Sequence, residues 1–236
     1  MNVSAVEGAL KTFISKHSVQ FHNLAVREPA LLEVGALTMA SEHYRLGGFS
    51  VSVENPKNGL FVAKLTSRGH PYNFSWFKCV RDGETYEIHS NLAVKGAHKD
   101  GAVYVVDVAV VEGADVVPKS KPKKPWLALD NKKLSTFIEV KKLIVYPMLL
   151  AQFIGIVHEI SPRSRRKSKA APKITCHFAP SLVTLGYLQG TSAKVLDGFA
   201  KRKYYICVVH NFDVHLSAMR RGATTASPFV AIAALV

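Results

Sequence analysis

Two acids and a lysine interrupt two of the most apolar stretches of this chain. Glu139 and Lys141 stand two residues apart in residues 134–143, and Asp107 is the only charged residue of residues 103–111. Side chains alternate between faces along a strand, so Glu139 and Lys141 are expected to point the same way. A charge on a buried strand is costly unless a partner or a ligand compensates it. These three residues are therefore the candidate site.

The chemistry open to this set is metal-assisted hydrolysis of a phosphodiester. Adjacent strands lie about 4.8 Å apart, so the carboxylates of Asp107 and Glu139 could converge on one ion. Carboxylate oxygens suit Mg²⁺ or Mn²⁺, either of which can activate water and stabilise charge on a phosphate. Lys141 could orient that water or stabilise the developing charge. The alternative is a structural ion pair between strands, with Lys141 bridging the two acids.

The elements that must position these residues follow from periodicity and turn signals. Pro29 suits a first helical turn, Gly47 and Gly48 suit a helix end, and Asp82-Gly83 is a tight hairpin turn. The predicted helices cover residues 4–16, 29–46, 146–160 and 192–201. The predicted strands cover residues 49–53, 60–65, 72–80, 85–94, 103–111, 134–143, 174–178 and 204–209.

This order predicts a mixed α/β fold around one central sheet. The sheet should begin as an antiparallel meander and become parallel through the helix at 146–160. We expect a single domain over residues 1–236. It consists of an N-terminal helical extension (1–27), a core (28–210) and a C-terminal tail (211–236).

The candidate site and the element order resemble the PD-(D/E)xK nuclease superfamily, which has the restriction-endonuclease-like fold. The matching motifs are Asp107 in VVDVAV and Glu139-Val-Lys141 in FIEVKK, and the likeness covers roughly residues 28–210. It implies that Asp107 and Glu139 bind metal, Mg²⁺ or Mn²⁺, and that Lys141 assists hydrolysis. It also implies a further acidic ligand from the helix before the sheet, which Glu33 resembles. Gln152 resembles an accessory glutamine that many members carry.

The charge of the chain favours a polyanionic partner. Lys and Arg outnumber Asp and Glu by 31 to 17, for a net charge of +14. Nucleic acid, with DNA first, is the expected partner. Two basic loops flank the Glu139 strand in sequence and could contact the phosphate backbone, although they could equally be solvated loops. Their basic residues are Lys119, Lys121, Lys123 and Lys124, and Arg163, Arg165, Arg166, Lys167 and Lys169.

His89 is a weaker accessory candidate. It shares a strand face with Glu87 and could contact a phosphate or a metal-bound water, although a strand-surface role is the more common one. The histidines show neither HxH nor HExxH spacing, and no P-loop, GxGxxG or GxSxG motif is present. The sequence therefore does not support zinc hydrolase, nucleotide-driven or serine hydrolase chemistry.

The remaining features concern location and partners. The three cysteines form no CxxC pair, which favours a reducing compartment, and we expect a cytoplasmic protein. No signal peptide or membrane span is predicted. The apolar tail from Pro228 to Val236 could mediate a homo-oligomer or dock on a partner protein.

Taken with the resemblance, the sequence predicts a Mg²⁺-dependent nuclease that hydrolyses DNA and could serve as the nuclease of a larger restriction or antiviral defence system. Two alternatives remain open. One is a nucleic-acid-binding module that keeps the fold without cleaving. The other is an interaction subunit with the same fold.

Overall fold

An eight-stranded mixed sheet runs through the computed structural model, which describes residues 28–98, 101–114, 116–123, 128–161, 176–212 and 218–221. The strands are β1 (Ser50–Glu54), β2 (Trp76–Arg81), β3 (Glu84–Lys95), β4 (Val103–Glu112), β5 (Leu134–Lys141), β6 (Ser181–Thr184), β7 (Cys207–His210) and β8 (Ala218–Arg221). The helices are α3 (Glu28–Leu46), α4 (Pro147–Ile160) and α5 (Gly190–Lys201), with short 3-10 turns η1 (Pro71–Asn73) and η2 (Asn131–Lys133).

The strands lie side by side in chain order, and the sheet changes character at β5. From β1 to β5 every neighbouring pair is antiparallel. The β5–β6 and β6–β7 pairs are parallel, with α4 and α5 in the two crossovers, because a strand–helix–strand connection makes parallel neighbours. β8, which the sequence did not predict, returns antiparallel to β7. The predicted mixed α/β class is confirmed, and the arrangement is consistent with a restriction-endonuclease-like fold.

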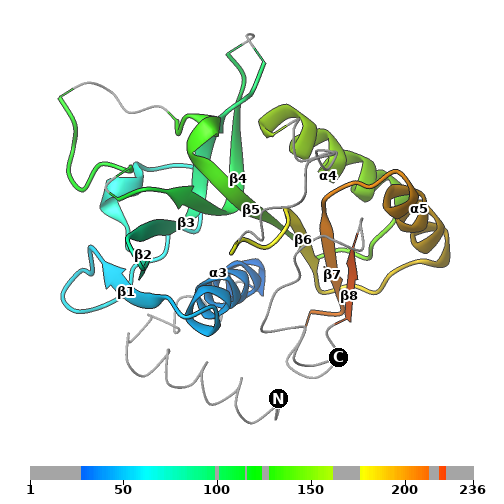
Figure 1. Ribbon diagram of the computed structural model, residues 1–236, viewed down its shortest axis with the longest axis horizontal. Helices are drawn as coiled ribbons and strands as arrows, with labels where there is room; N and C mark the ends of the chain where they lie inside the picture. The colour runs from blue at the N-terminus through cyan, green and yellow to red at the C-terminus, as the bar shows by residue number, and fades with distance from the viewer. Residues whose placement is uncertain are drawn as a thin grey trace.

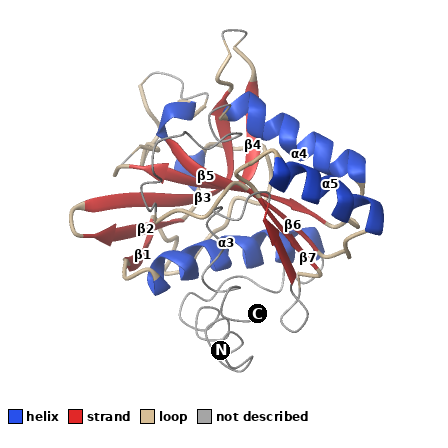
Figure 2. Ribbon diagram, turned by 45° about the vertical axis from the view of Figure 1, so that its right-hand side comes forward, coloured by secondary structure: helices blue, strands red, loops and turns tan. Residues whose placement is uncertain are grey.

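Helices cover both faces of the sheet (Figures 1 and 2). α3 crosses one face, where its Leu37 and Tyr44 pack with the strand residues Ile88 and Ile138 in one core cluster. α4 and α5 cover the other face and form a second cluster with the strands. The two clusters identify the face on which each strand residue lies.

Local sequence signals determine where several of these elements begin and end. α3 ends at the predicted glycines, where Gly48 has a φ of +85° that a residue without a Cβ adopts without strain. Asp82 and Gly83 both have positive φ and form the predicted hairpin turn between β2 and β3. Pro147 begins α4 at the first helical position, as expected.

The strand predicted over residues 60–65 is wrong. The segment runs beside β3, but side chains take up several of its backbone groups. The Val62 amide donates to Ser75 Oγ at 3.0 Å, and the Lys64 amide donates to Ser90 Oγ at 3.1 Å. The carbonyl of Lys64 accepts from the Asn91 side chain at 3.0 Å. Periodicity favoured a strand here, yet these side-chain partners replace a strand ladder.

The strand predicted over residues 174–178 is also displaced. Residues 176–178 are not a strand, and the strand of this region is β6, beginning at Ser181. The Cys176 carbonyl is hydrogen-bonded to the His43 ring at 2.9 Å, which engages it outside any ladder. Residues 174 and 175 lie outside the described part of the chain, as do the predicted helix over 4–16 and the tail from Pro228. No helix among the described residues is long and apolar enough to cross a membrane.

Candidate active site

β4 and β5 stop pairing at the row that holds Asp107 and Glu139. The ladder between the strands ends at Val108 and Ile138, and its register would place Asp107 opposite Glu139. At this point the backbone N–H of Val140 donates to Asp107 Oδ2 at 2.6 Å. The Asp107 side chain thus takes up a backbone donor where the strands separate. The two acids identified from the sequence meet at this separation.

Asn91 extends the same row on the other side of Asp107. The β3–β4 register continues on both sides of Asn91 and would place it opposite Asp107, but this pair is missing from the ladder. Asn91 has a φ of +48°, a left-handed conformation that is uncommon inside a strand. Asparagine tolerates this conformation better than most residues. The row Asn91–Asp107–Glu139 therefore marks an irregular line across the sheet.

The irregular row changes the face on which neighbouring residues lie. Ile88 and Val108 pack in the core cluster beneath α3, whereas Leu92 and Val106 pack in the cluster beneath α4 and α5. In regular strands, residues separated by two or four positions share a face. The alternation therefore changes phase across Asn91 and Asp107, and polar groups gather where it does so.

Lys141 lies between the two strand acids. Its Nζ is 3.2 Å from Glu139 Oε2 and 3.6 Å from Asp107 Oδ2. The Lys141 side chain is 38% exposed, whereas that of Glu139 is 5% exposed. The ammonium group therefore reaches buried carboxylates from a position that a ligand in solution can approach.

Glu33 joins the group from α3, as the sequence resemblance implied. Its Oε2 accepts a hydrogen bond from Asn91 Nδ2 at 2.7 Å. Burial raises the pKa of Glu33 to about 7, against the hydrogen bond from Asn91, and the nearby charge of Asp107 raises it further. Asn91 thereby links the α3 carboxylate to the row of strand acids.

Lys64 is a second lysine at this site. It is almost fully buried, and its Nζ donates to the Asn91 carbonyl at 2.6 Å and the Thr66 carbonyl at 2.7 Å. Burial lowers the pKa of Lys64 to about 8, while the charge of Glu33 acts in the opposite direction. Lys64 and Glu33 thus both contact the left-handed residue Asn91 through hydrogen bonds.

Glu139 carries an unsatisfied buried atom. Its Oε1 is buried without a hydrogen-bond partner among the described residues. Burial raises the pKa of Glu139 to about 7, and the charges of Asp107 and Glu33 add to this, while Lys141 opposes it. A buried oxygen without a donor is costly, and such an atom in a native fold calls for an explanation.

The other two members of the group are perturbed in the same environment. Burial raises the pKa of Asp107, against Lys141 and the Val140 N–H. Burial alone would lower the pKa of Lys141, but the charges of Glu139 and Asp107 outweigh it and raise it. Three carboxylates share two nearby ammonium groups, those of Lys141 and Lys64, so full ionisation leaves one negative charge that a divalent cation would neutralise.

The chemical types of the donors at this site suit a hard divalent cation. The donors are carboxylate oxygens from three elements, α3, β4 and β5, and Glu139 Oε1 is a buried acceptor that has no donor within the described ranges. Oxygen-only donor sets suit Mg²⁺ or Mn²⁺ rather than softer metals. Asp107 and Glu139 could hold such an ion, with Glu33 as a further carboxylate beside it.

The remaining predicted site residues lie elsewhere or outside the description. His89 is buried, its Nε2 lies 3.1 Å from Glu87 Oε2, and its ring stacks on Trp76 at 5.3 Å between centroids. It is thus a core residue hydrogen-bonded to Glu87 rather than a strand-surface residue. Gln152 is exposed on α4.

The basic loops can be placed only in part. Lys119, Lys121 and Lys123 are exposed, as a contact with a phosphate backbone requires. The other basic loop residues lie outside the described part of the chain, namely Lys124, Arg163, Arg165, Arg166, Lys167 and Lys169. That the two loops flank the acids in space remains a prediction.

Sequence reasoning missed Asn91 and Lys64. An asparagine inside a predicted strand is unusual, since asparagine is depleted in strands, and this was the available signal. Lys64 gave none, because its role depends on a loop that runs beside β3. Both residues became recognisable only through the register and the hydrogen bonds around Asn91.

Comparison with family models and with curated proteins finds no match to this chain. Among solved structures, the chain is similar to NucC of P. aeruginosa ATCC27853 in its cAAA-bound form. The TM-score is 0.36 with 15% identity, over 64% of this chain and 70% of that one. At this level the match supports no inference about activity.

Proposed function

We propose that this protein is a metal-dependent nuclease of the PD-(D/E)xK type. The observation that carries the proposal is the buried Oε1 of Glu139, which has no donor in the part of the chain that the structure describes and lies in a cluster with Asp107, Glu33 and Lys141. Perturbed carboxyl groups gathered at a break in a sheet are typical of catalytic sites. The net charge of +14 favours a nucleic acid substrate, with DNA expected first.

Each residue has a distinct part in this proposal. Asp107 and Glu139 hold a Mg²⁺ or Mn²⁺ ion, and Glu33 supports it from α3. When bound, such an ion lowers the pKa of a water molecule and stabilises charge on the scissile phosphate. Lys141, which is the partly exposed member of the group, places its ammonium group against the phosphate and stabilises the charge that develops there.

The test is cleavage of plasmid and linear DNA by the full chain, with Mg²⁺, Mn²⁺ or EDTA. We expect products with either metal and none in EDTA. Glu139→Gln keeps the size of the side chain and removes its charge, so it should abolish cleavage. Equal cleavage by the wild type and this variant, when both are purified by the same procedure, would refute the site.

The alternative is a binding module that keeps the same arrangement without cleaving. The contacts of Lys141 with both acids are the observation in its favour, because they also describe a structural ion pair. This alternative predicts salt-sensitive binding of DNA or RNA that persists in EDTA, with no products under any metal condition. A role in restriction or antiviral defence stays a prediction. The same holds for the alternative of an interaction subunit that docks through the C-terminal tail.

A further inference from the structure

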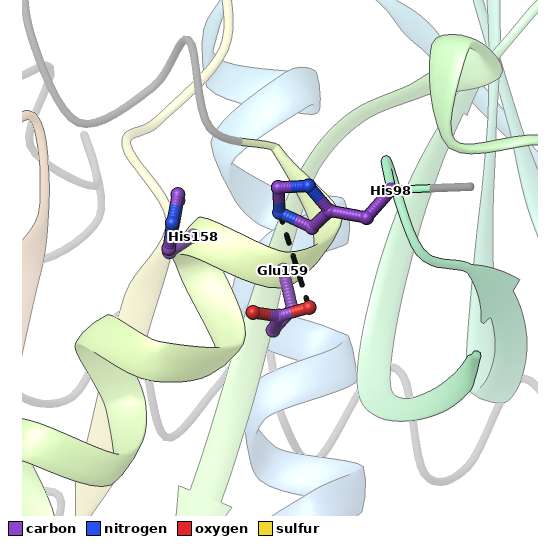
Figure 3. A group of neighbouring side chains, drawn as sticks. All are labelled: His98, His158 and Glu159. Carbon is purple, nitrogen blue, oxygen red and sulfur yellow. Dashed lines mark ion pairs between the residues drawn. The ribbon is translucent and has the colours of Figure 1, made fainter. Parts of the chain in front are cut away.

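A second group of metal-ligating side chains lies apart from the acids of the sheet. His158 and Glu159 belong to the last turn of α4, and His98 follows β3. Each offers one ligand atom, and these atoms all lie within 4.8 Å of one another. Figure 3 shows His98 facing Glu159, with the ring of His158 beside them. The three side chains come from two segments that are about sixty residues apart.

The backbone holds these two segments together independently of the side chains. The Ala97 amide donates to the Glu159 carbonyl at 2.7 Å, one residue from His98. Asn131 Nδ2 donates to the Ile160 carbonyl at 2.9 Å and fixes the end of α4. The positions of the candidate ligands are therefore determined by the fold, and a cation would find them already close together.

The side chains around the group suit a bound cation. Tyr104 OH donates to Glu159 Oε2 at 3.1 Å, the kind of outer contact that orients a ligating carboxylate. His158 Nδ1 is buried and has no hydrogen-bond partner among the described residues. His98 Nε2 is 3.9 Å from Glu159 Oε2, a distance too long for a hydrogen bond. The polar atoms thus converge without satisfying one another.

We propose that His98, His158 and Glu159 form a transition-metal site that links the β3–β4 connection to the C-terminal end of α4. Two imidazoles and a carboxylate are a donor set of Zn²⁺. Ligand atoms around tetrahedral zinc lie roughly 3.4 Å apart, so binding requires a small closure of the group. His98, which is 44% exposed, can supply that movement. This inference does not depend on the proposed nuclease function.

The test is a Zn²⁺ titration of metal-free full-length protein against a chromophoric chelator. It uses the double variant Asp107→Asn with Glu139→Gln, so that the acids of the sheet do not contribute to the result. We expect one tightly bound Zn²⁺ in this background. Adding His98→Ala or His158→Ala should weaken it by more than about tenfold, since even outer-shell changes cost that much.

His70→Ala is the matched control, because His70 is an exposed histidine that stacks on Tyr72 away from this group. It should leave Zn²⁺ affinity unchanged. Zn²⁺ should also raise the thermal midpoint of the double variant by more than about 2 °C, and His98→Ala should remove that rise. Unchanged affinity in His98→Ala would overturn the proposal. That variant decides the question even if His158→Ala fails to fold, since His98 is exposed.

Discussion

Asp107 accepts the backbone N–H of Val140 at 2.6 Å, at the point where β4 and β5 cease to pair. One carboxylate therefore bonds to the neighbouring strand and also lies within reach of Lys141. Substitutions of Asp107 can therefore separate its structural role, which is to accept the Val140 N–H, from its proposed role in binding metal.

Asp107→Asn and Asp107→Ala should differ in stability but not in activity. Both remove the metal-binding charge, so both should lower DNA cleavage by more than about a hundredfold. Asparagine can still accept the Val140 N–H, whereas alanine leaves that donor unsatisfied at a cost of about 1–3 kcal/mol. Urea unfolding and single-turnover cleavage measure the two effects. Full cleavage by Asp107→Asn would contradict the assignment.

Lys141→Met should lower cleavage without weakening the metal site. Loss of a positive charge that stabilises the transition state costs about 10²–10³ in rate. Removing the ammonium group also removes a competitor for Glu139, so Mn²⁺ affinity measured by calorimetry should be unchanged or higher. Lys142→Met, which changes the exposed neighbouring lysine, is the control. If Lys141 only bridges two structural acids, Lys141→Met will reduce the free energy of unfolding, and neither the wild type nor the variant will show Mn²⁺-dependent cleavage.

Asn91 should matter both for its conformation and for its hydrogen bond to Glu33. Asn91→Gly keeps the positive φ at little cost but loses the side-chain amide. Because Glu33 then loses the hydrogen bond that orients it, cleavage should fall about tenfold. Asn91→Ala loses the same amide and is also strained, so it should be less stable than the glycine variant by about 1 kcal/mol. Thermal unfolding of the pair measures this difference. Equal stabilities would argue against a left-handed residue at this position.

The raised pKa of Glu139 predicts how metal-free stability depends on pH. A carboxyl group with a pKa of about 7 in the folded state and an ordinary value near 4.5 when unfolded retains its proton longer when folded. Its contribution to the free energy of unfolding is therefore favourable at low pH and is lost as pH rises from about 4.5 to about 7. In EDTA, Glu139→Gln should be similar to the wild type at pH 4.5. At pH 8 it should be more stable than the wild type, by on the order of 1–3 kcal/mol.

Denaturant unfolding at the two pH values measures this difference, and comparing the two proteins cancels the titration of groups that do not interact with Glu139. Mn²⁺ at pH 8 should stabilise the wild type and not the variant. A variant that is less stable than the wild type at pH 8 in EDTA would mean that Glu139 is held ionised by Lys141 as a structural ion pair.

The sequence was informative where one residue broke a strong pattern. Asp107 and Glu139 stood out because each interrupts an apolar strand, and the structure brings both to the row where those strands separate. Asn91 and Lys64 could not be found in this way, because their roles arise from a positive φ and from a loop whose backbone bonds to side chains. Periodicity likewise predicted a strand over 60–65, since it cannot reveal which partners satisfy the backbone.

The position of a bound divalent ion tests the central claim most directly. Crystals of the full chain containing Mn²⁺ can be measured for anomalous scattering, with crystals of Glu139→Gln as the matched control. We predict a peak in the wild type roughly 2.1 Å from Glu139 Oε1 and from an oxygen of Asp107, and no peak at that position in the variant. A wild-type map without density between these carboxylates, with Lys141 still bridging them, would contradict the metal site and the nuclease function built on it.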